Sequence, residues 1–172
     1  MSYDDLDALD EGDEDSSANT FVTFLVEGEE YAVEVRYVTE IVRLQRIFAV
    51  PDVPAYIRGV INLRGKVIPL VDVRARFGFR EEAYSDRTVV LVIESADTRT
   101  GLIVDAVSDV VEIPPTSIEP APARASRTSG LVRGVGKRAE RVSFILDVPP
   151  LLAADEMPSL GPSSRPERSQ PV

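Results

Sequence analysis

The stretch that decides the fold is residues 59–72, which read GVINLRGKVIPLVD. Apolar runs rich in Val and Ile stand on either side of Arg64-Gly65, and a short break that ends in glycine between two such runs is typical of a tight β-hairpin. Pro69 lies inside the second run. Because proline has no N–H to donate to a ladder, we expect its strand at a sheet edge or beside a bulge. Asn62 is expected to bond the backbone of the turn, which would leave Arg64 as an ordinary solvated side chain.

Runs of the same kind fill residues 19–152 and predict about ten short strands. They are expected at 21–26, 31–35, 40–50, 59–63, 66–71, 88–94, 101–107, 108–113, 131–136 and 141–148, with 108–113 continuing the strand before it. Helical signals are confined to single turns at 35–39, 53–59, 73–77 and 149–154, the third of them N-capped by Asp72. Because no crossover helix of about ten residues separates the strands, a parallel sheet is disfavoured. The pattern predicts an all-β, mostly antiparallel fold, arranged as two small barrels or one sandwich.

The composition excludes several classes of chemistry. The chain has 172 residues, 44% of them apolar and 28% charged, which fits a globular protein of one domain or two small ones. It contains neither cysteine nor histidine. Disulfides, the usual zinc and haem sites, Cys or Ser-His nucleophiles and phosphorylation on histidine are therefore excluded. The acidic first residues and the lack of an apolar run of roughly 18 to 20 residues predict a cytoplasmic chain with no direct membrane insertion.

The formal net charge of −10 is concentrated at the N-terminus. Residues 1–18 hold eight of the 29 acids and no Lys or Arg, so the remaining residues carry 21 acids against 19 bases, a net charge of −2. A nearly neutral body argues against nucleic acid as a partner, since phosphate binding needs clustered cations. Residues 1–18 are expected to form a disordered acidic tail that solvates the chain, the alternative being a docking arm. Residues 153–172, rich in Pro and Ser, are expected to form a second disordered tail.

The strand expected at 21–26 is apolar on both faces, as the sequence FVTFLV shows. A small barrel with one solvated face needs apolar residues only at alternate positions, so something besides the strand's own barrel has to cover its second face. The second barrel is one candidate for this cover. An exposed apolar patch that binds a partner protein is the other.

At this point the residues resemble a known family. GVINLRG followed by VIPLVD is similar to the signature of the CheW-like chemotaxis coupling proteins, and three further stretches agree with that family in the same order. They are EEYAVEVRYVTEI at 29–41, GLIVDAVSDVVEI at 101–113 and ILDVPPLL at 145–152. The resemblance covers about 21–152, so we expect one CheW-like domain at 19–152 between the two tails. It departs from the family pattern around 120–141, which is rich in Arg and Gly and would make contacts of its own.

This resemblance implies two intertwined five-stranded SH3-like β-barrels with a few short helical turns, no catalysis and no cofactor. Family members bridge the cytoplasmic tips of methyl-accepting chemoreceptors and the regulatory domain of the histidine kinase CheA, so recruitment to membrane-associated receptor arrays is implied. A receptor groove between the barrels would carry Val38, Glu40, Gly59, Asn62, Arg64, Val89 and Val107. An end-to-end barrel contact with the kinase would use Val22 and Val35. We expect Glu40 and Arg64 to form a bidentate ion pair that holds the hairpin turn against the third strand.

Two alternatives to this function are kept. The first is a coupling protein of a chemosensory pathway whose output is not swimming. The second is a β-barrel hydrolase that uses two paired carboxylates drawn from Asp72, Asp105, Asp109 and Asp147. Acids that follow strands more often cap turns, and the segment GVGK at 134–137 lacks the length of a phosphate-binding Walker loop.

Overall fold

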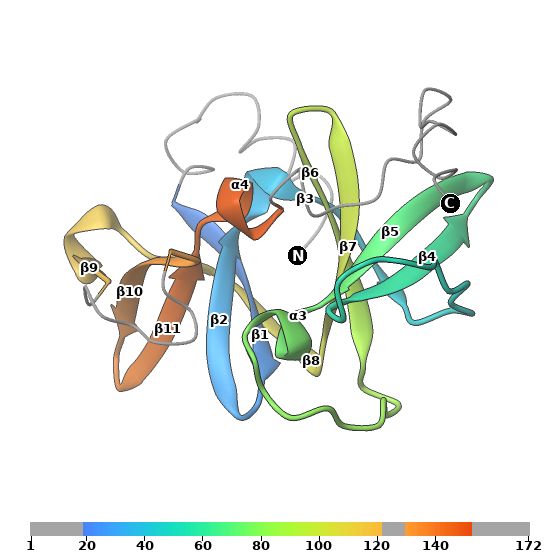
Figure 1. Ribbon diagram of the computed structural model, residues 1–172. Helices are drawn as coiled ribbons and strands as arrows, with labels where there is room; N and C mark the ends of the chain where they lie inside the picture. Colours follow the sequence, from blue (N-terminus) through green and yellow to red (C-terminus); the bar gives the residue numbers. More distant parts are fainter. Residues whose placement is uncertain (1–18, 122–129, 153–172) are drawn as a thin grey trace.

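The structure, a computed structural model, describes residues 19–121 and 130–152. These residues form two β-sheets that lie against each other, with short helical turns at their margins (Figure 1). The two tails expected at 1–18 and 153–172 lie outside the described residues, as does the centre of the divergent segment 120–141. The described residues contain no helix that is long and apolar enough to cross a membrane.

Two separate parts of the chain form the first sheet, and the single part between them forms the second sheet. The first sheet has the order β8-β1-β2-β11-β10-β9 and the second has the order β3-β6-β7-β5-β4. The strands are β1 Thr20–Val26, β2 Glu29–Glu34, β3 Val38–Arg43, β4 Ile57–Leu63, β5 Lys66–Asp72, β6 Val89–Ser95, β7 Thr98–Val104, β8 Ala106–Glu112, β9 Ile118–Pro120, β10 Val132–Arg138 and β11 Arg141–Leu146. Because β3 to β7 are inserted between β2 and β8, the two units are intertwined, and the predicted all-β fold is confirmed. The sixth strand of the first sheet, β9, was not predicted because three residues that end in proline give no strand signal.

The deciding hairpin forms as expected. β4 and β5 pair antiparallel across Arg64 and Gly65, whose φ values are 53° and 87°. A turn with positive φ at both central residues matches the right-handed twist of the strands, and glycine adopts that conformation without cost. The Gly65 N–H donates to Asn62 Oδ1 at 2.9 Å, which confirms the predicted bond between the Asn62 side chain and the turn.

Pro69 lies in an interior strand, so its predicted place at a sheet edge is wrong. β5 has β7 on one side and β4 on the other. Val60, the residue opposite Pro69, directs its N–H and C=O to Phe48 instead, and the parallel ladder with β7 begins only at Leu70. A register shift opposite Leu70 and Val71 adjoins this position, so the expected bulge is present. Proline is tolerated here because neither neighbouring strand requires its missing N–H.

The run expected as one strand at 40–50 is divided between the two edges of the second sheet. Val38–Arg43 pairs with β6, and after a break Phe48 forms an isolated bridge with Val60 of β4. One stretch of chain therefore reaches both β6 and β4. Because β3 and β4 are the two edge strands of the sheet, this stretch closes the sheet into a barrel.

Three of the four expected helical turns are present. They are the 3₁₀ turn η1 Val35–Tyr37, the helix α3 Val73–Arg76 and the helix α4 Val148–Leu151, while a further 3₁₀ turn, η2 Pro115–Ser117, was not predicted. Asp72 caps α3 as predicted, accepting hydrogen bonds from the N–H groups of Arg74 and Ala75. Of the turn expected at 53–59, the structure forms a turn at 54–57, in which the Ile57 N–H donates to the Pro54 carbonyl at 3.0 Å, but no helix. Ile57 already begins β4, and the Tyr56 carbonyl accepts a hydrogen bond from the Asp72 N–H, which extends the β4–β5 pairing backwards.

The chain also breaks where one continuous strand was expected. β7 ends at Val104, and β8 begins at Ala106 in the other sheet, so 108–113 does not continue the strand at 101–107. Asp105 is the residue at this crossing. Its N–H donates to the Leu25 carbonyl at 3.0 Å, and its carboxylate accepts from the Glu27 N–H at 3.0 Å. Leu25 lies in β1 and Glu27 in the turn that follows it, so these two hydrogen bonds direct the chain into the first sheet.

The described residues form three apolar cores. One core fills the second barrel around Ile61, Leu70 and Val92, and a smaller one in the first barrel contains Phe21 and Ile145. The largest core lies between the barrels and draws residues from both of them, among them Val22, Phe24, Val33, Val71, Leu91 and Leu102. The second face of β1 is therefore covered by the other barrel, which was one of the two predicted candidates.

Gly59 provides a test of this architecture. Its φ is 138°, and an added Cβ would lie 2.3 Å from the carbonyl oxygen of Phe48. We expect Gly59→Ala to lower the free energy of unfolding by about 1–2 kcal/mol for the backbone and about 1–3 kcal/mol more for the clash. The matched control is Gly65→Ala, because Gly65 also has positive φ but has no atom within 4 Å of such a Cβ. Urea unfolding of both variants should show the larger loss at Gly59, and equal losses would mean that the Phe48 carbonyl moves aside freely.

Candidate functional site

Three of the seven residues expected in the groove border the core between the barrels, although Val38 and Val89 lie at opposite ends of the β3–β6 pair, opposite Ile93 and Arg43. Val38 on β3, Val89 on β6 and Val107 on β8 are half-buried and pack against the large core between the barrels. Val38 and Val89 lie on neighbouring strands of the second sheet, while Val107 comes from the first. The three side chains thus mark the outer margin of the core between the barrels, with part of each exposed.

Glu40 and Arg64 form the expected ion pair, and its position explains what the pair does. Arg64 Nη2 donates to Glu40 Oε2, a single contact where a bidentate one was expected. Glu40 belongs to edge strand β3, and Arg64 to the turn beside edge strand β4, so the pair links the two edges that close the second barrel. The side chain of Arg64 is 67% exposed and that of Glu40 is 26% exposed, which leaves most of the guanidinium available to a partner.

The electrostatics of this pair follow from its geometry. The hydrogen bond from Arg64 lowers the pKa of the Glu40 carboxyl, because it favours the charged form. A carboxyl whose pKa is lower in the folded chain contributes stability above its unfolded pKa and loses that contribution as the pH falls through the folded value. The pair therefore remains ionised at neutral pH. Its contribution to stability is small, because exposed ion pairs are screened by water and salt.

Gly59 and Asn62 are explained by the local backbone. Gly59 is buried and lets the Phe48 carbonyl approach β4, and Asn62 accepts the hydrogen bond that fixes the turn. Both residues shape the hairpin that carries Arg64. Of the seven groove residues, three border the junction of the barrels, two form the ion pair and two fix the hairpin.

The two residues expected at the kinase contact lie in different surroundings. Val22 is 2% exposed inside the core between the barrels, so its side chain offers no surface to a partner. Val35 is half-buried at the start of η1, the segment that carries the chain from the first sheet to the second. The expected exposure of Val22 thus fails because the second barrel covers the strand. Val35 lies only three residues from Val38, so the two expected contact regions adjoin each other.

The four aspartates considered for hydrolysis lie in three settings, because Asp72 and Asp105 belong to one polar network around Arg74. Asp72 caps α3 and also accepts hydrogen bonds from Arg58 Nε and the Tyr84 hydroxyl. Asp105 bonds Arg74 and the Glu27 amide, while one carboxylate oxygen of Asp109 accepts from the following N–H. Asp147 precedes α4 without making a side-chain cap bond. Asp72 and Asp105 both bond Arg74, the first through the backbone N–H and the second through Nε, so their carboxylates are occupied by structural contacts. The described residues hold no cluster of three or more acids, Cys or His that could bind a metal.

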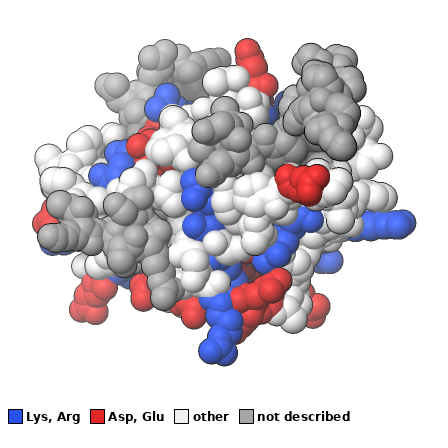
Figure 2. Space-filling view, in the orientation of Figure 1, with Lys and Arg blue, Asp and Glu red and all other residues white. Residues whose placement is uncertain are grey.

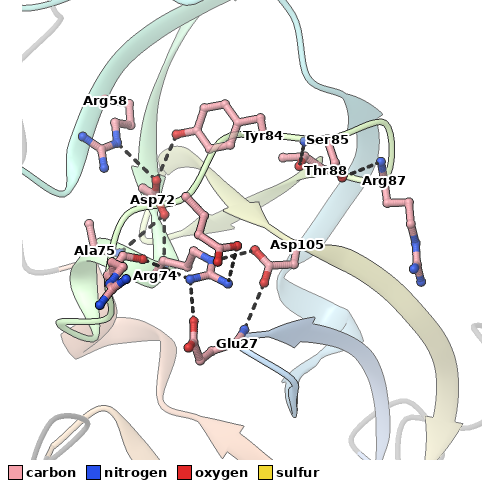
Figure 3. Close-up of polar contacts among 12 residues, drawn as sticks. Glu27, Arg58, Asp72, Arg74, Ala75, Tyr84, Ser85, Arg87, Thr88 and Asp105 are labelled. Atoms are coloured by element: carbon pink, nitrogen blue, oxygen red, sulfur yellow. Dashed lines mark hydrogen bonds and ion pairs between the residues drawn. The ribbon is translucent and has the colours of Figure 1, made fainter.

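Arg74 is the largest polar feature that sequence reasoning missed (Figure 3). Its side chain is only 11% exposed and is surrounded by the carboxylates of Glu27, Glu82 and Asp105. In the sequence Arg74 is one of two cations in the turn at 73–77, and nothing distinguishes it from Arg76. Its partners Asp105 and Glu27 are 31 and 47 residues away along the chain, so only the folded structure identifies it.

A second polar network lies beside Arg74 and holds the segment 79–88, which lies between α3 and β6. The Tyr84 hydroxyl donates to Asp72 Oδ2 at 2.9 Å, and Arg58 Nε donates to the same oxygen at 3.1 Å. Burial, followed by the negative charge of Asp72, raises the pKa of Tyr84 to about 12. The phenol therefore stays protonated at neutral pH and can donate this hydrogen bond.

The charges on the surface are mixed in sign. Figure 2 shows Lys and Arg interspersed with Asp and Glu over the face in view, with acidic side chains gathered along its lower edge. Binding to a nucleic-acid backbone requires a continuous basic stripe or patch, and this face carries none among its described residues.

Comparison with known proteins identifies the family. A family model described as the CheW-like domain matches residues 20–156. The chain is 36% identical over 135 residues to the chemotaxis protein CheW of Helicobacter pylori, covering 78% of this chain and 82% of that protein. It is 34% identical over 142 residues to CheW of Bacillus subtilis, covering 82% and 91%, and 28% identical over 120 residues to protein PilI of Pseudomonas aeruginosa, covering 69% and 67%.

A solved structure agrees with these matches. The crystal structure of the scaffolding protein TtCheW from Thermoanaerobacter tengcongensis superposes with a TM-score of 0.76 at 32% identity, covering 81% of this chain and 95% of that one. Sequence and architecture point to the same relatives, and the resemblance noted in the sequence is confirmed: this chain belongs to the CheW-like family.

Proposed function

We propose that this chain is a non-catalytic scaffold that binds the cytoplasmic tips of chemoreceptors and the regulatory domain of a CheA-type histidine kinase at the same time. The observation that carries the proposal is the half-exposed margin of the core between the barrels in a chain of the CheW-like family. A surface of this kind can bind an apolar helix face without any reacting group.

The receptor contact is assigned to the groove margin formed by Val38, Val89 and Val107, with the Glu40–Arg64 pair beside it. The valines supply apolar surface that a partner would remove from water, and the exposed guanidinium of Arg64 supplies a forked donor for a carboxylate or a carbonyl. Gly59 and Asn62 contribute by holding the hairpin that presents Arg64. Apolar contact would give affinity, while the guanidinium would fix the orientation of the receptor helix.

The kinase contact is assigned to the surface around Val35. Val22 supports this surface from within the core, since β1 contacts η1. Because η1 connects the two sheets, a kinase domain bound there would lie close to the receptor groove. Signal transfer would then be a coupling free energy between two adjacent binding events and would require no reaction of the scaffold itself.

The remaining parts of the proposal concern location and organisation. Residues 19–152 would form the working domain, flanked by the acidic segment 1–18 and the Pro/Ser-rich segment 153–172. The protein would work in the cytoplasm and reach membrane-associated receptor arrays through its partners. The same two contacts would serve a pathway with an output other than swimming, and motility assays of a deletion strain would distinguish the outputs.

The receptor contact is tested with Arg64→Ala in the full chain. We expect affinity for a receptor-tip fragment to fall by roughly tenfold, the loss of one charged hydrogen bond, while the melting temperature changes by only a degree or two, since exposed pairs add little stability. Calorimetric titration and thermal unfolding measure the two quantities. Lys137→Ala is the control, because Lys137 also forms one exposed ion pair, with Glu119, but belongs to β10 of the first sheet, away from Glu40 and Arg64. Unchanged receptor affinity in Arg64→Ala would contradict this assignment.

The kinase contact is tested with Val35→Asp. We expect this variant to lose most of its affinity for the kinase regulatory domain, because a carboxylate would have to be desolvated in an apolar contact. Titration against the regulatory domain and against the receptor-tip fragment separates the two surfaces. Val67→Asp is the control, because Val67 is an exposed valine on β5, away from η1. Equal kinase affinity in wild type, Val35→Asp and Val67→Asp would move the contact elsewhere.

A further inference from the structure

The guanidinium of Arg74 joins three separate parts of the chain. Its Nε donates to Asp105 Oδ1 at 3.1 Å, and its Nη1 pairs with Glu27 in the turn between β1 and β2. The same Nη1 donates to the Arg80 carbonyl at 3.0 Å, and Nη2 lies 3.3 Å from Glu82 Oε1. One side chain on α3 of the second barrel thus holds the first barrel, the crossing between the sheets and the segment 79–88 (Figure 3).

These contacts restrict motions that the apolar core alone would permit. Apolar burial is non-directional, so the core between the barrels holds them together without fixing the register between them. A guanidinium fork directs its hydrogen bonds along fixed axes, and charged hydrogen bonds of low exposure are the strong ones. Asp105 strengthens this arrangement because its second carboxylate oxygen accepts the Glu27 N–H. The Arg74 side chain therefore fixes the crossing relative to the β1–β2 turn.

The segment 79–88, which we call the strap, depends on the same anchor. It contains no helix or strand, and besides Arg74 it is fastened by the pair Arg58–Glu81 and by the Tyr84–Asp72 hydrogen bond. The strap ends in a turn in which the Thr88 N–H donates to the Ser85 carbonyl, and the next residue is Val89. How the strap is fastened therefore determines where β6 begins.

Two of the three groove valines lie further along the segments that Arg74 anchors at Glu82 and at Asp105. Val89 follows the strap, and Val107 comes two residues after Asp105 at the crossing. We propose that Arg74 is a positioning residue for the receptor groove, setting Val89 and Val107 relative to each other although its hydrogen bonds and ion pairs go to neither valine. This inference rests on the proposed function, because it assigns a role to that groove.

The experiment compares Arg74→Gln with the matched control Arg58→Gln in the full chain. Arg58 also holds the strap and a carboxylate of the same network, but its ion-pair partners Asp72 and Glu81 both belong to the second barrel. In Arg74→Gln we expect hydrogen exchange at 79–88 and 105–107 to become faster, since local opening follows the loss of local anchors. We expect receptor-tip affinity to fall by roughly tenfold while kinase affinity stays within about twofold. Arg58→Gln should speed exchange in the strap only and lower receptor affinity less than Arg74→Gln does, because Asp105 and the segment that leads to Val107 keep their anchor.

Several outcomes would overturn the positioning role. Unchanged receptor affinity in Arg74→Gln, or losses of receptor and kinase affinity in equal proportion, would show that Arg74 acts on stability alone. If Arg74→Gln fails to fold, Glu27→Gln replaces it, because it removes only the bridge to the first barrel from a partly exposed side chain. Glu27→Gln should then reproduce the receptor-specific loss, and its absence would overturn the inference. A wild-type chain that binds no receptor tip would instead refute the proposed function, and the exchange comparison would still test whether Arg74 holds the crossing.

Discussion

The constraint on which the structure depends is the burial of two faces of one strand pair. β1 and β2 present apolar side chains on both sides, with Phe21 and Ala32 in the first barrel and Val22 and Val33 in the core between the barrels. A sheet that is apolar on both faces cannot leave either face in water without losing the free energy of burial. The second barrel provides the missing cover. The two barrels are therefore parts of one folding unit, and the path of the chain through both sheets reflects this dependence.

Polar contacts fix how the strands and the crossing between the sheets are oriented around the apolar core. The chain crosses between sheets at Asp105, where backbone, carboxylate and the Arg74 guanidinium are bonded together. Elsewhere Glu30, 7% exposed, bonds Ser143 and pairs with Arg138 and Arg141, which ties β2 to the hairpin of β10 and β11. Buried carboxylates are tolerated because each is matched by cations and donors. A scaffold that acts by contact needs such fixed geometry, since a groove that changes shape freely would transmit little coupling free energy.

The turn of the β4–β5 hairpin and the helix cap that follows it could be predicted in detail because their determinants are local. Asn62, Gly65 and the capping Asp72 each act on backbone groups within three residues. The Glu40–Arg64 pair could also be predicted, but only through family resemblance, because the two residues are 24 positions apart. Val22 was expected at a surface because an apolar strand face looks the same to a sequence whether a second barrel or a partner protein covers it. Pro69 was expected at an edge or beside a bulge, and the choice between them depended on neighbouring strands that the sequence does not identify.

The sequence by itself determined the strand pattern, the tight turns, the helix cap and the absence of cysteine and histidine chemistry, because each of these depends on residue type and short spacing. Only the tertiary structure decided that the run at 40–50 serves two sheet edges, that the chain changes sheets at Asp105 and that Arg74 joins both barrels. Asp105 and the Glu27 amide that it bonds are 78 residues apart. No local pattern encodes such a contact, because it exists only after the two sheets have packed against each other.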